Sequence, residues 1–142
     1  MTEYVYVLDC SVTMSWLIQD EENLDSIKLR EELFEGQAIV PSLWSLEVAN
    51  VLLQSEKKKR ITPFQSSACI KLLQNMPIQI DSKTSELAMN RVLELSREYK
   101  LSIYDACYLE LSLRLPCPLA TLDKQLTLAA KGAGIPVLPS PR

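Results

Sequence analysis

Four carboxylates have the residue types and positions best suited to chemistry: Asp9, Glu47, Asp105 and Asp123. Asp9 and Asp123 each directly follow a short apolar run, whereas Glu47 and Asp105 lie early in largely apolar helical segments. In an open parallel sheet, sites form outside the carboxyl ends of the strands. We therefore expect these four side chains to converge on one edge of a sheet.

Converging carboxylates would suit metal-assisted hydrolysis of phosphodiesters. Four negative charges in one cleft repel one another, and the pKa of each would be raised without a cation. A divalent ion removes that repulsion, and Mg²⁺ and Mn²⁺ both prefer oxygen ligands. Such an ion can lower the pKa of a bound water, which becomes the nucleophile, and can stabilise charge on the phosphate and the leaving group.

Composition excludes several other chemistries. The chain of 142 residues has no histidine, so it has no Ser-His-Asp triad, Cys-His pair or histidine metal ligand. Three glycines leave no glycine-rich phosphate loop. The four cysteines, Cys10, Cys69, Cys107 and Cys117, lack the close spacing of zinc ligands. We expect them to be free, small apolar side chains in a reducing compartment.

The net charge of −3 argues weakly against a protein that coats nucleic acid nonspecifically. Without the four candidate ligands, 18 − 4 = 14 acidic residues face 15 basic ones. The negative charge is then mainly that of the candidate site. The run Lys57–Arg60 could guide RNA, or its cations could simply complement a helix C-terminus.

Three of the carboxylates also have an ordinary structural explanation. Asp9 and Asp123 could each cap the helix that follows. Asp105 could complete a Ser102-x-x-Asp105 capping box. Ser11 and Thr121, each two residues from an aspartate, could orient carboxylates or waters, or make only local turn hydrogen bonds.

Glu47 is the hardest carboxylate to explain as structural, because it lies beyond the first turn of its helix. Its segment is nearly all apolar, and Glu47, Asn50 and Gln54 form one narrow polar stripe. This composition predicts a buried helix, in which a charge needs a partner. Trp16 and Trp44 could stack on bases, although packing in the core is the favoured interpretation.

Short apolar strands alternate with helices, which predicts a single α/β domain over residues 1–142 with a parallel sheet covered on both faces. The predicted strands are Tyr4–Leu8, Ala38–Val40, Ile78–Ile80, Leu119–Leu122 and Ile135–Leu138. The predicted helices cover about Glu22–Glu35, Leu43–Lys59, Pro63–Asn75, Ser85–Tyr99, Tyr104–Leu115 and Lys124–Lys131. Ser42 is a candidate N-cap, Thr62 to Gln65 forms a capping box, and Pro139–Arg142 is expected to be a loose tail.

The sequence also predicts a cytoplasmic, soluble protein. Met1-Thr2-Glu3 lacks the basic segment that begins a signal peptide. No apolar run approaches the roughly 18 residues that a membrane span requires.

At the acidic positions the sequence resembles the PIN domain family, and specifically the VapC-type toxin ribonucleases. The matching stretches are Val7–Ser11, Glu47–Leu52, Tyr104–Leu109 and Thr121–Leu126, in the order in which the family has them. The resemblance implies a three-layer α/β/α sandwich with a parallel sheet of about five strands. It also implies an endoribonuclease dependent on Mg²⁺ or Mn²⁺.

The resemblance further assigns roles to residues and implies partners. Asp9, Glu47, Asp105 and Asp123 would be the catalytic and metal-binding quartet, and the supporting polar positions would be Ser11, Asn50 and Thr121. The expected partners are the RNA substrate, a second copy of the chain and a protein antitoxin that covers the active-site groove.

Two other interpretations stay open at this point. A response-regulator receiver also gathers aspartates around Mg²⁺, but it usually has two adjacent acids after its first strand and a lysine after its last. Asp9 has no acidic neighbour, and no lysine follows Ile135–Leu138. A PIN-like module without catalytic activity, which only binds a partner, is the other alternative.

Overall fold

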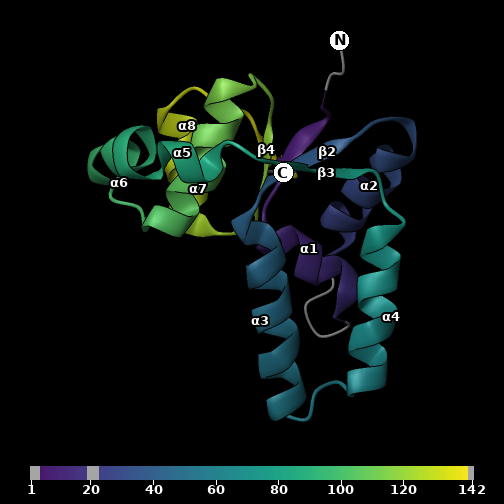
Figure 1. Ribbon diagram of the computed structural model, residues 1–142. Helices are drawn as coiled ribbons and strands as arrows, with labels where there is room; N and C mark the ends of the chain where they lie inside the picture. Colours follow the sequence, from purple (N-terminus) through teal and green to yellow (C-terminus); the bar gives the residue numbers. More distant parts are fainter. Residues whose placement is uncertain (1–3, 19–22, 141–142) are drawn as a thin grey trace.

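The computed structural model describes residues 4–18 and 23–140, which form an α/β/α sandwich around a five-stranded parallel sheet (Figure 1). The strands are β1 (Tyr6–Leu8), β2 (Ala38–Pro41), β3 (Ile78–Asp81), β4 (Leu119–Ala120) and β5 (Val137–Leu138). The helices are α1 (Cys10–Leu17), α2 (Leu24–Glu32), α3 (Leu43–Lys57), α4 (Pro63–Gln74), α5 (Thr84–Leu87), α6 (Leu93–Tyr99), α7 (Ile103–Arg114) and α8 (Lys124–Gly132). The predicted fold class is confirmed.

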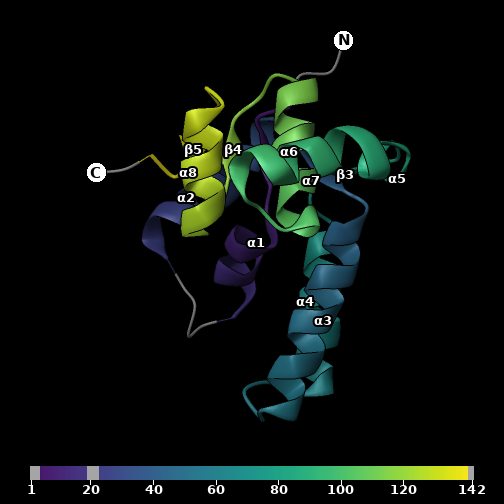
Figure 2. The ribbon, with the colours of Figure 1, turned by 90° about the vertical axis from the view of Figure 1, so that its left-hand side faces the viewer.

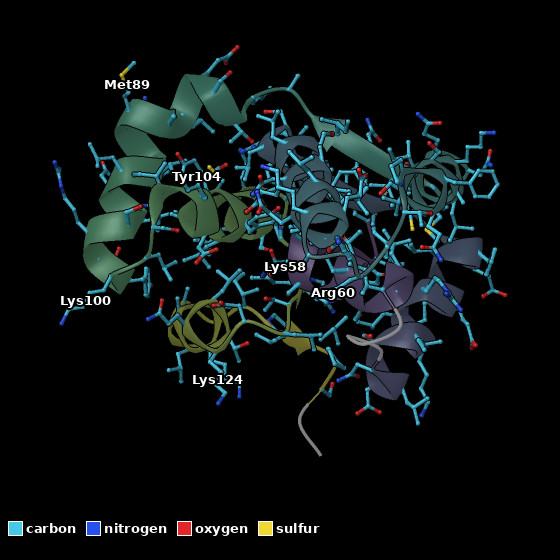
Figure 3. The ribbon with its side chains drawn as sticks, turned by 90° about the horizontal axis from the view of Figure 1, so that it is seen from below. Lys58, Arg60, Met89, Lys100, Tyr104 and Lys124 are labelled. Carbon is cyan, nitrogen blue, oxygen red and sulfur yellow. The ribbon has the colours of Figure 1, made fainter. Side chains whose placement is uncertain are left out.

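The strand order is β3-β2-β1-β4-β5, so β1 is the central strand. The chain builds outward from β1 to β3 and then returns to place β4 on the other side of β1. The carboxyl ends of β1 and β4 are therefore the switch point of the sheet, where parallel α/β folds form their sites. Figure 3 looks onto this edge from below, with Tyr104 of α7 and Lys124 of α8 on the same side.

The core lies on both faces of the central strands. Tyr6, Val7 and Leu8 of β1 are completely buried, as expected for an apolar strand covered on both sides. Figures 1 and 2 show α5 to α8 together on one side of the sheet and α1 and α2 on the other. Trp16 and Trp44 are buried, as predicted, and their indole N–H groups donate to the carbonyl of Ser26 and the hydroxyl of Thr13.

Helix α1 has no counterpart among the predicted helices. Six of its residues, Cys10, Val12, Thr13, Met14, Ser15 and Trp16, are buried. A helix buried on most sides has no polar face and so lacks the periodicity by which helices are recognised. The predicted strand Leu119–Leu122 also ends earlier, at Ala120, because the next two residues make hydrogen bonds to the loop after β1.

The prediction that the helix around Glu47 is buried is wrong for one side of the helix. Helix α3 buries only Trp44, Val48, Leu52 and Ser55, while Leu46 is 75% exposed. Helices α3 and α4 project together from the body as a helical hairpin (Figures 1 and 2). One side of α3 therefore presents apolar residues that nothing in the described part of the chain covers.

The predicted helix caps have mixed outcomes. The Thr62 to Gln65 capping box is present in both directions. Ser42 precedes α3 but has helical backbone angles and makes no capping hydrogen bond. The predicted helix Ser85–Tyr99 is divided into α5, a π-helical turn over Ala88–Val92 and α6.

Some predictions fall partly outside the described residues, namely those for Met1 to Glu3, for Glu22 and for the end of the tail Pro139–Arg142. The four cysteines form no disulfide, and three of them, Cys10, Cys107 and Cys117, are buried in the core. None of the helices in the described ranges has the length and apolar composition that a membrane span needs.

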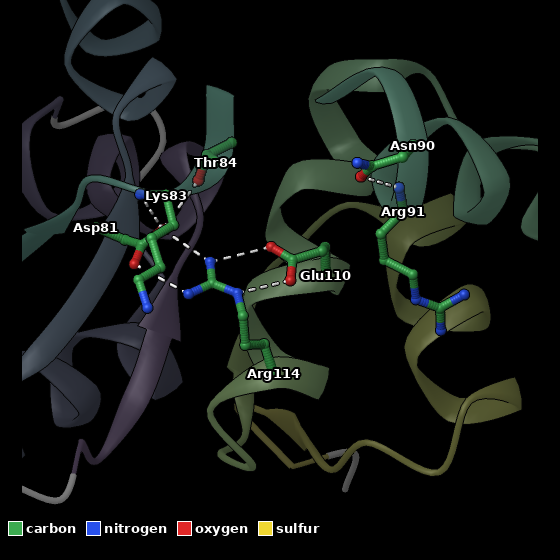
Figure 4. A network of polar contacts seen from close by, with 7 residues as sticks. All are labelled: Asp81, Lys83, Thr84, Asn90, Arg91, Glu110 and Arg114. Carbon is green, nitrogen blue, oxygen red and sulfur yellow. Dashed lines mark hydrogen bonds and ion pairs between the residues drawn. The ribbon is translucent and has the colours of Figure 1, made fainter. Parts of the chain in front are cut away.

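A buried ion network fixes α7 against the outer part of the sheet (Figure 4). The Arg114 guanidinium donates two hydrogen bonds to Asp81 at the end of β3, at 3.1 and 2.8 Å, and two to Glu110 on its own helix, at 2.7 and 3.1 Å. Glu110 is only 3% exposed. Burial raises the pKa of Asp81, but the hydrogen bonds and charge of Arg114 outweigh it, and the net shift is downward.

We expect Arg114→Met to lower the free energy of unfolding by about 3 kcal/mol, because it leaves the buried Glu110 without a cation. The loss should shrink as the pH falls from the ordinary carboxyl pKa of about 4 through the lowered pKa of Asp81, because protonation of Asp81 weakens the native network itself. Urea denaturation at several pH values measures both effects. The double variant Arg114→Met/Glu110→Met should recover stability relative to Arg114→Met, and equal stability of the two would contradict a charge-burial cost.

Candidate active site

Asp9 is the best-positioned residue of the site, directly after the central strand. Its backbone N–H donates to the carbonyl of Ala120, at 3.0 Å, and continues the pairing of β1 with β4. Its side chain is 5% exposed and accepts hydrogen bonds from the hydroxyls of Thr121, at 2.6 Å, and Ser11, at 2.8 Å. Asp9 occupies the N-cap position of α1 but its side chain makes no capping hydrogen bond. The carboxylate is therefore held by hydroxyls at the switch point.

The same two hydroxyls join the loops that follow β1 and β4. Ser11 accepts a hydrogen bond from the backbone N–H of Leu122, at 2.9 Å, and Thr121 accepts one from that of Asp123, at 3.0 Å. The two hydroxyl oxygens are 3.4 Å apart. The bond from Asp123 to Thr121 is local, but the bonds from Leu122 to Ser11 and from Thr121 to Asp9 join segments more than a hundred residues apart in the sequence. Both hydroxyls therefore do more than make local turn hydrogen bonds.

Asp123 and Asp105 lie at helix N-termini on the same edge. Asp123 caps α8, since its Oδ1 accepts from the N–H of Leu126 at 2.8 Å, and this predicted structural role is confirmed. Asp105 lies in the first turn of α7, where its N–H donates to the hydroxyl of Ser102 at 3.1 Å. Both aspartates are half-buried, and the helix dipoles favour a negative charge at these positions.

Glu47 enters the site from α3 through a contact with α7. The hydroxyl of Tyr108, which is completely buried, donates to Oε1 of Glu47. Tyr108 lies three residues after Asp105, on the same face of α7. Sequence reasoning did not select Tyr108 as a site residue, although its spacing from Asp105 was the signal available.

Asn50 differs from the other residues of the predicted set. It lies one turn beyond Glu47 on α3 and is exposed. Its side chain makes no hydrogen bond within the described ranges. Its predicted supporting role would therefore require a contact with a bound molecule and not with another residue of these ranges.

The pKa values show that the carboxylates act on one another. Burial is the main cause of the raised pKa of Asp9, and Asp123 adds to it. Burial also raises the pKa of Glu47, with contributions from Asp9 and Asp105. For Asp105, burial is again the largest cause, followed by the charges of Asp123 and Asp9. The four side chains therefore share one electrostatic field, and no described lysine or arginine contributes to these shifts.

Hard oxygen donors with uncompensated negative charge fit a divalent cation such as Mg²⁺ or Mn²⁺. Asp9, Glu47, Asp105 and Asp123 are the residues that could hold one. Within residues 4–18 and 23–140, no three acidic or cysteine side chains stand close enough to enclose an ion. The fit therefore rests on the chemistry of the donors and on their shared field.

Comparison with known proteins agrees with this geometry. The sequence model of the PIN domain matches residues 6–132, which include all four carboxylates. Among solved structures, the crystal structure of PAE2754 from Pyrobaculum aerophilum superposes with a TM-score of 0.66. It is 23% identical, and the match covers 97% of this chain and 92% of that one, which shows a shared fold. No curated protein matches.

The raised pKa values predict how stability changes with pH when no divalent ion is present. Between the ordinary carboxyl pKa, about 4, and neutral pH, the folded protein binds more protons than the unfolded chain. The free energy of unfolding should therefore fall as the pH rises through this window. Thermal unfolding in EDTA at a series of pH values measures it, and Asp9→Asn should flatten the slope. Stability that instead increases from about pH 5 to 7 in EDTA would contradict the assigned shifts.

We expect Tyr108→Phe to weaken Mn²⁺ binding about tenfold, because residues that orient metal ligands typically contribute this much. The change keeps the buried ring and removes only the hydroxyl that donates to Glu47. The shift of the unfolding midpoint during Mn²⁺ titration gives the affinity. Tyr99→Phe is the matched control, since the hydroxyl of Tyr99 makes no hydrogen bond in the described structure. Equal Mn²⁺ affinity in both variants would show that Tyr108 does not position Glu47.

Proposed function

The chain belongs to the PIN domain family, and we propose that it is a divalent-metal-dependent endoribonuclease, the toxin of a type II toxin–antitoxin pair. PIN domains are generally metal-dependent nucleases. The observation that carries the proposal is the mutual influence of the four carboxylates around Asp9 at the switch point of the sheet. The carboxylates repel one another unless a cation is bound between them, and a bound cation can in turn hold a phosphate.

In this proposal Asp9, Glu47, Asp105 and Asp123 are both metal ligands and catalytic residues, and Mg²⁺ or Mn²⁺ is the cofactor. The bound ion would acidify a water and neutralise charge on the scissile phosphate. The chain's own contribution is orientation. Ser11 and Thr121 hold the carboxylate of Asp9, and Asp123 keeps one oxygen on its helix cap.

Tyr108 supports the proposed role of Glu47 in the same way. Burial raises the pKa of the Tyr108 phenol, so the hydroxyl stays protonated and remains a hydrogen-bond donor. By occupying Oε1 of Glu47, it leaves the other carboxylate oxygen for the cation. Asn50, one turn away on α3, is proposed as a ligand of water or substrate.

Exposed apolar surface supports the proposed protein partners, a second copy of the chain and an antitoxin. Leu46 and Leu53 of α3 are 75% and 47% exposed, and Ile80 of the edge strand β3 is 51% exposed. A groove of about 450 Å³ lies between α3, α4 and β3, with apolar residues such as Trp44 and Ile70 in its walls. Apolar patches of this kind mark sites of protein contact.

The receiver alternative does not agree with the sheet. Receivers have the strand order 2-1-3-4-5, whereas this sheet has β3-β2-β1-β4-β5. An inactive PIN-like binding module is the remaining alternative. It would retain the fold and the acidic residues but would show no metal-dependent cleavage.

We expect the purified protein to cleave RNA with Mn²⁺ or Mg²⁺ and to lose the activity in EDTA. Asp9→Asn should lower the cleavage rate by more than about a hundredfold, since orienting residues alone contribute up to that amount. Glu35→Gln is the matched control, because Glu35 is an exposed acid just before β2, at the opposite edge of the sheet. The readout is gel-resolved cleavage of total RNA, together with growth during expression. An absence of metal-dependent cleavage and of any effect on growth would favour the inactive module.

A further inference from the structure

Cations and one aromatic ring surround the acidic centre on the carboxyl edge of the sheet. Viewed from below, Lys100, Tyr104 and Lys124 lie on this side of the molecule, with Lys58 and Arg60 at the tip of the α3–α4 hairpin (Figure 3). We name Lys100, Tyr104 and Lys124 the rim. Its members come from the end of α6, the start of α7 and the start of α8, the last two next to Asp105 and Asp123.

Lys100 occupies a backbone conformation that lysine disfavours. It follows α6 with φ +57° and ψ +44°, in the left-handed region where helices usually place glycine or asparagine. A residue with a Cβ carries a conformational cost there. Lys100 is exposed and makes no ion pair within the described residues, so its side chain does not compensate for the cost inside the protein.

Lys124 does not stabilise the helix in which it lies. It is the first residue of α8, where the helix dipole disfavours a positive charge. Its side chain is exposed, and it is not among the groups that shift the pKa values of Asp9, Glu47 or Asp105. The charge of Lys124 is disfavoured by the dipole of α8, and Lys100 is disfavoured by its left-handed backbone. Neither lysine is among the groups that shift the pKa values of Asp9, Glu47 or Asp105, so both exposed side chains can meet an external anion.

Tyr104 adds an exposed ring to these charges. It directly precedes Asp105 and is 65% exposed, whereas Tyr108 of the same helix is completely buried. An aromatic ring open to solvent beside a phosphate-cleaving centre can stack on a base that is not paired. Paired bases of a duplex would not be free to do so.

Beside Lys100 the surface is hollow enough to take part of a nucleotide. A depression of about 360 Å³ lies between the end of α6 and the start of α8, and it is lined by Tyr99, Lys100, Gln125 and Leu128, with Glu98 and Ala129 completing its walls. Lys100 and Gln125 face it from two different helices. The depression thus extends from Lys100 to Gln125, the residue that follows Lys124 in the sequence.

From these observations we infer that the rim binds single-stranded RNA next to the cleavage site. One base stacks on Tyr104, and the flanking phosphates contact Lys124 and Lys100. The inference deepens the proposed ribonuclease function by assigning substrate contacts to residues outside the acidic quartet. The more distant Lys58 and Arg60 would contribute to attraction of the strand, not to its placement.

The test is fluorescence anisotropy with a short, single-stranded 2′-O-methyl oligoribonucleotide of mixed sequence, which resists cleavage. Tyr104→Ala should weaken binding about tenfold, and Tyr104→Phe should preserve it. Lys100→Asn should weaken binding severalfold without lowering the unfolding midpoint, because asparagine tolerates the left-handed conformation. Each lost phosphate contact should also reduce the slope of log affinity against log salt by about 0.7.

Matched controls lie at the opposite edge of the sheet. Phe34→Ala removes a ring that is 83% exposed just before β2, and Lys131→Asn removes an exposed cation in the last turn of α8. Both controls should bind RNA as the unmodified protein does. Unchanged affinity in the Tyr104→Ala and Lys100→Asn variants would overturn the inference. The inference would also be overturned if a polyglutamate peptide bound as tightly as the oligoribonucleotide and the same variants abolished that binding. This result would identify an acidic protein segment as the ligand.

This result is separable from the nuclease test. Rim-dependent binding of the uncleavable strand, combined with no metal-dependent cleavage, would support the rim and reject the catalytic proposal. Cleavage that needs Asp9, combined with unchanged cleavage and RNA binding in the Tyr104→Ala and Lys100→Asn variants, would support the catalytic proposal and reject the rim.

Discussion

The site depends on the burial of the Asp9 carboxylate at the switch point of the sheet. A buried charge is costly unless it is hydrogen-bonded or paired, and no described cation pairs with it. Ser11 and Thr121 instead supply hydroxyl donors from the two loops that meet there. Their own oxygens then accept backbone N–H groups from the loop after β4. Satisfying one carboxylate therefore determines where β4 ends and where α8 begins.

The position of Asp9 and Asp123 could be predicted from the sequence because it follows from topology alone. Asp9 directly follows β1 and Asp123 comes three residues after the end of β4, both strands are apolar, and parallel strands place their carboxyl ends on one edge. Tyr108 could not be chosen in this way, because its contact with Glu47 depends on how α3 packs against α7. Helix α1 was missed for a related reason. Its burial removes the alternation of polar and apolar residues on which prediction depends.

Helix α3 shows where composition misleads. Its apolar residues predict burial, yet Leu46 and Leu53 are exposed because the helix projects from the body with α4. Apolar composition indicates that a helix face can pack against another apolar surface, but it does not show whether that surface belongs to the same chain. The projecting α3–α4 hairpin therefore carries two exposed surfaces of different chemistry. One is the apolar side of α3, and the other is the cationic tip.

Helix α7 explains how the site can be both charged and rigid. Near its start it carries Asp105, one turn later it holds Glu47 through Tyr108, and at its end Arg114 joins Glu110 to Asp81. The helix also packs against β1 and β2, so the strand that precedes Asp9 and the helix that ends in Arg114 share one interface. A catalytic constellation must be held by elements that cannot shift independently. Here the repelling carboxylates are placed at one end of α7, and the charge pairs that secure the helix are at the other, where they stabilise the fold without neutralising the site.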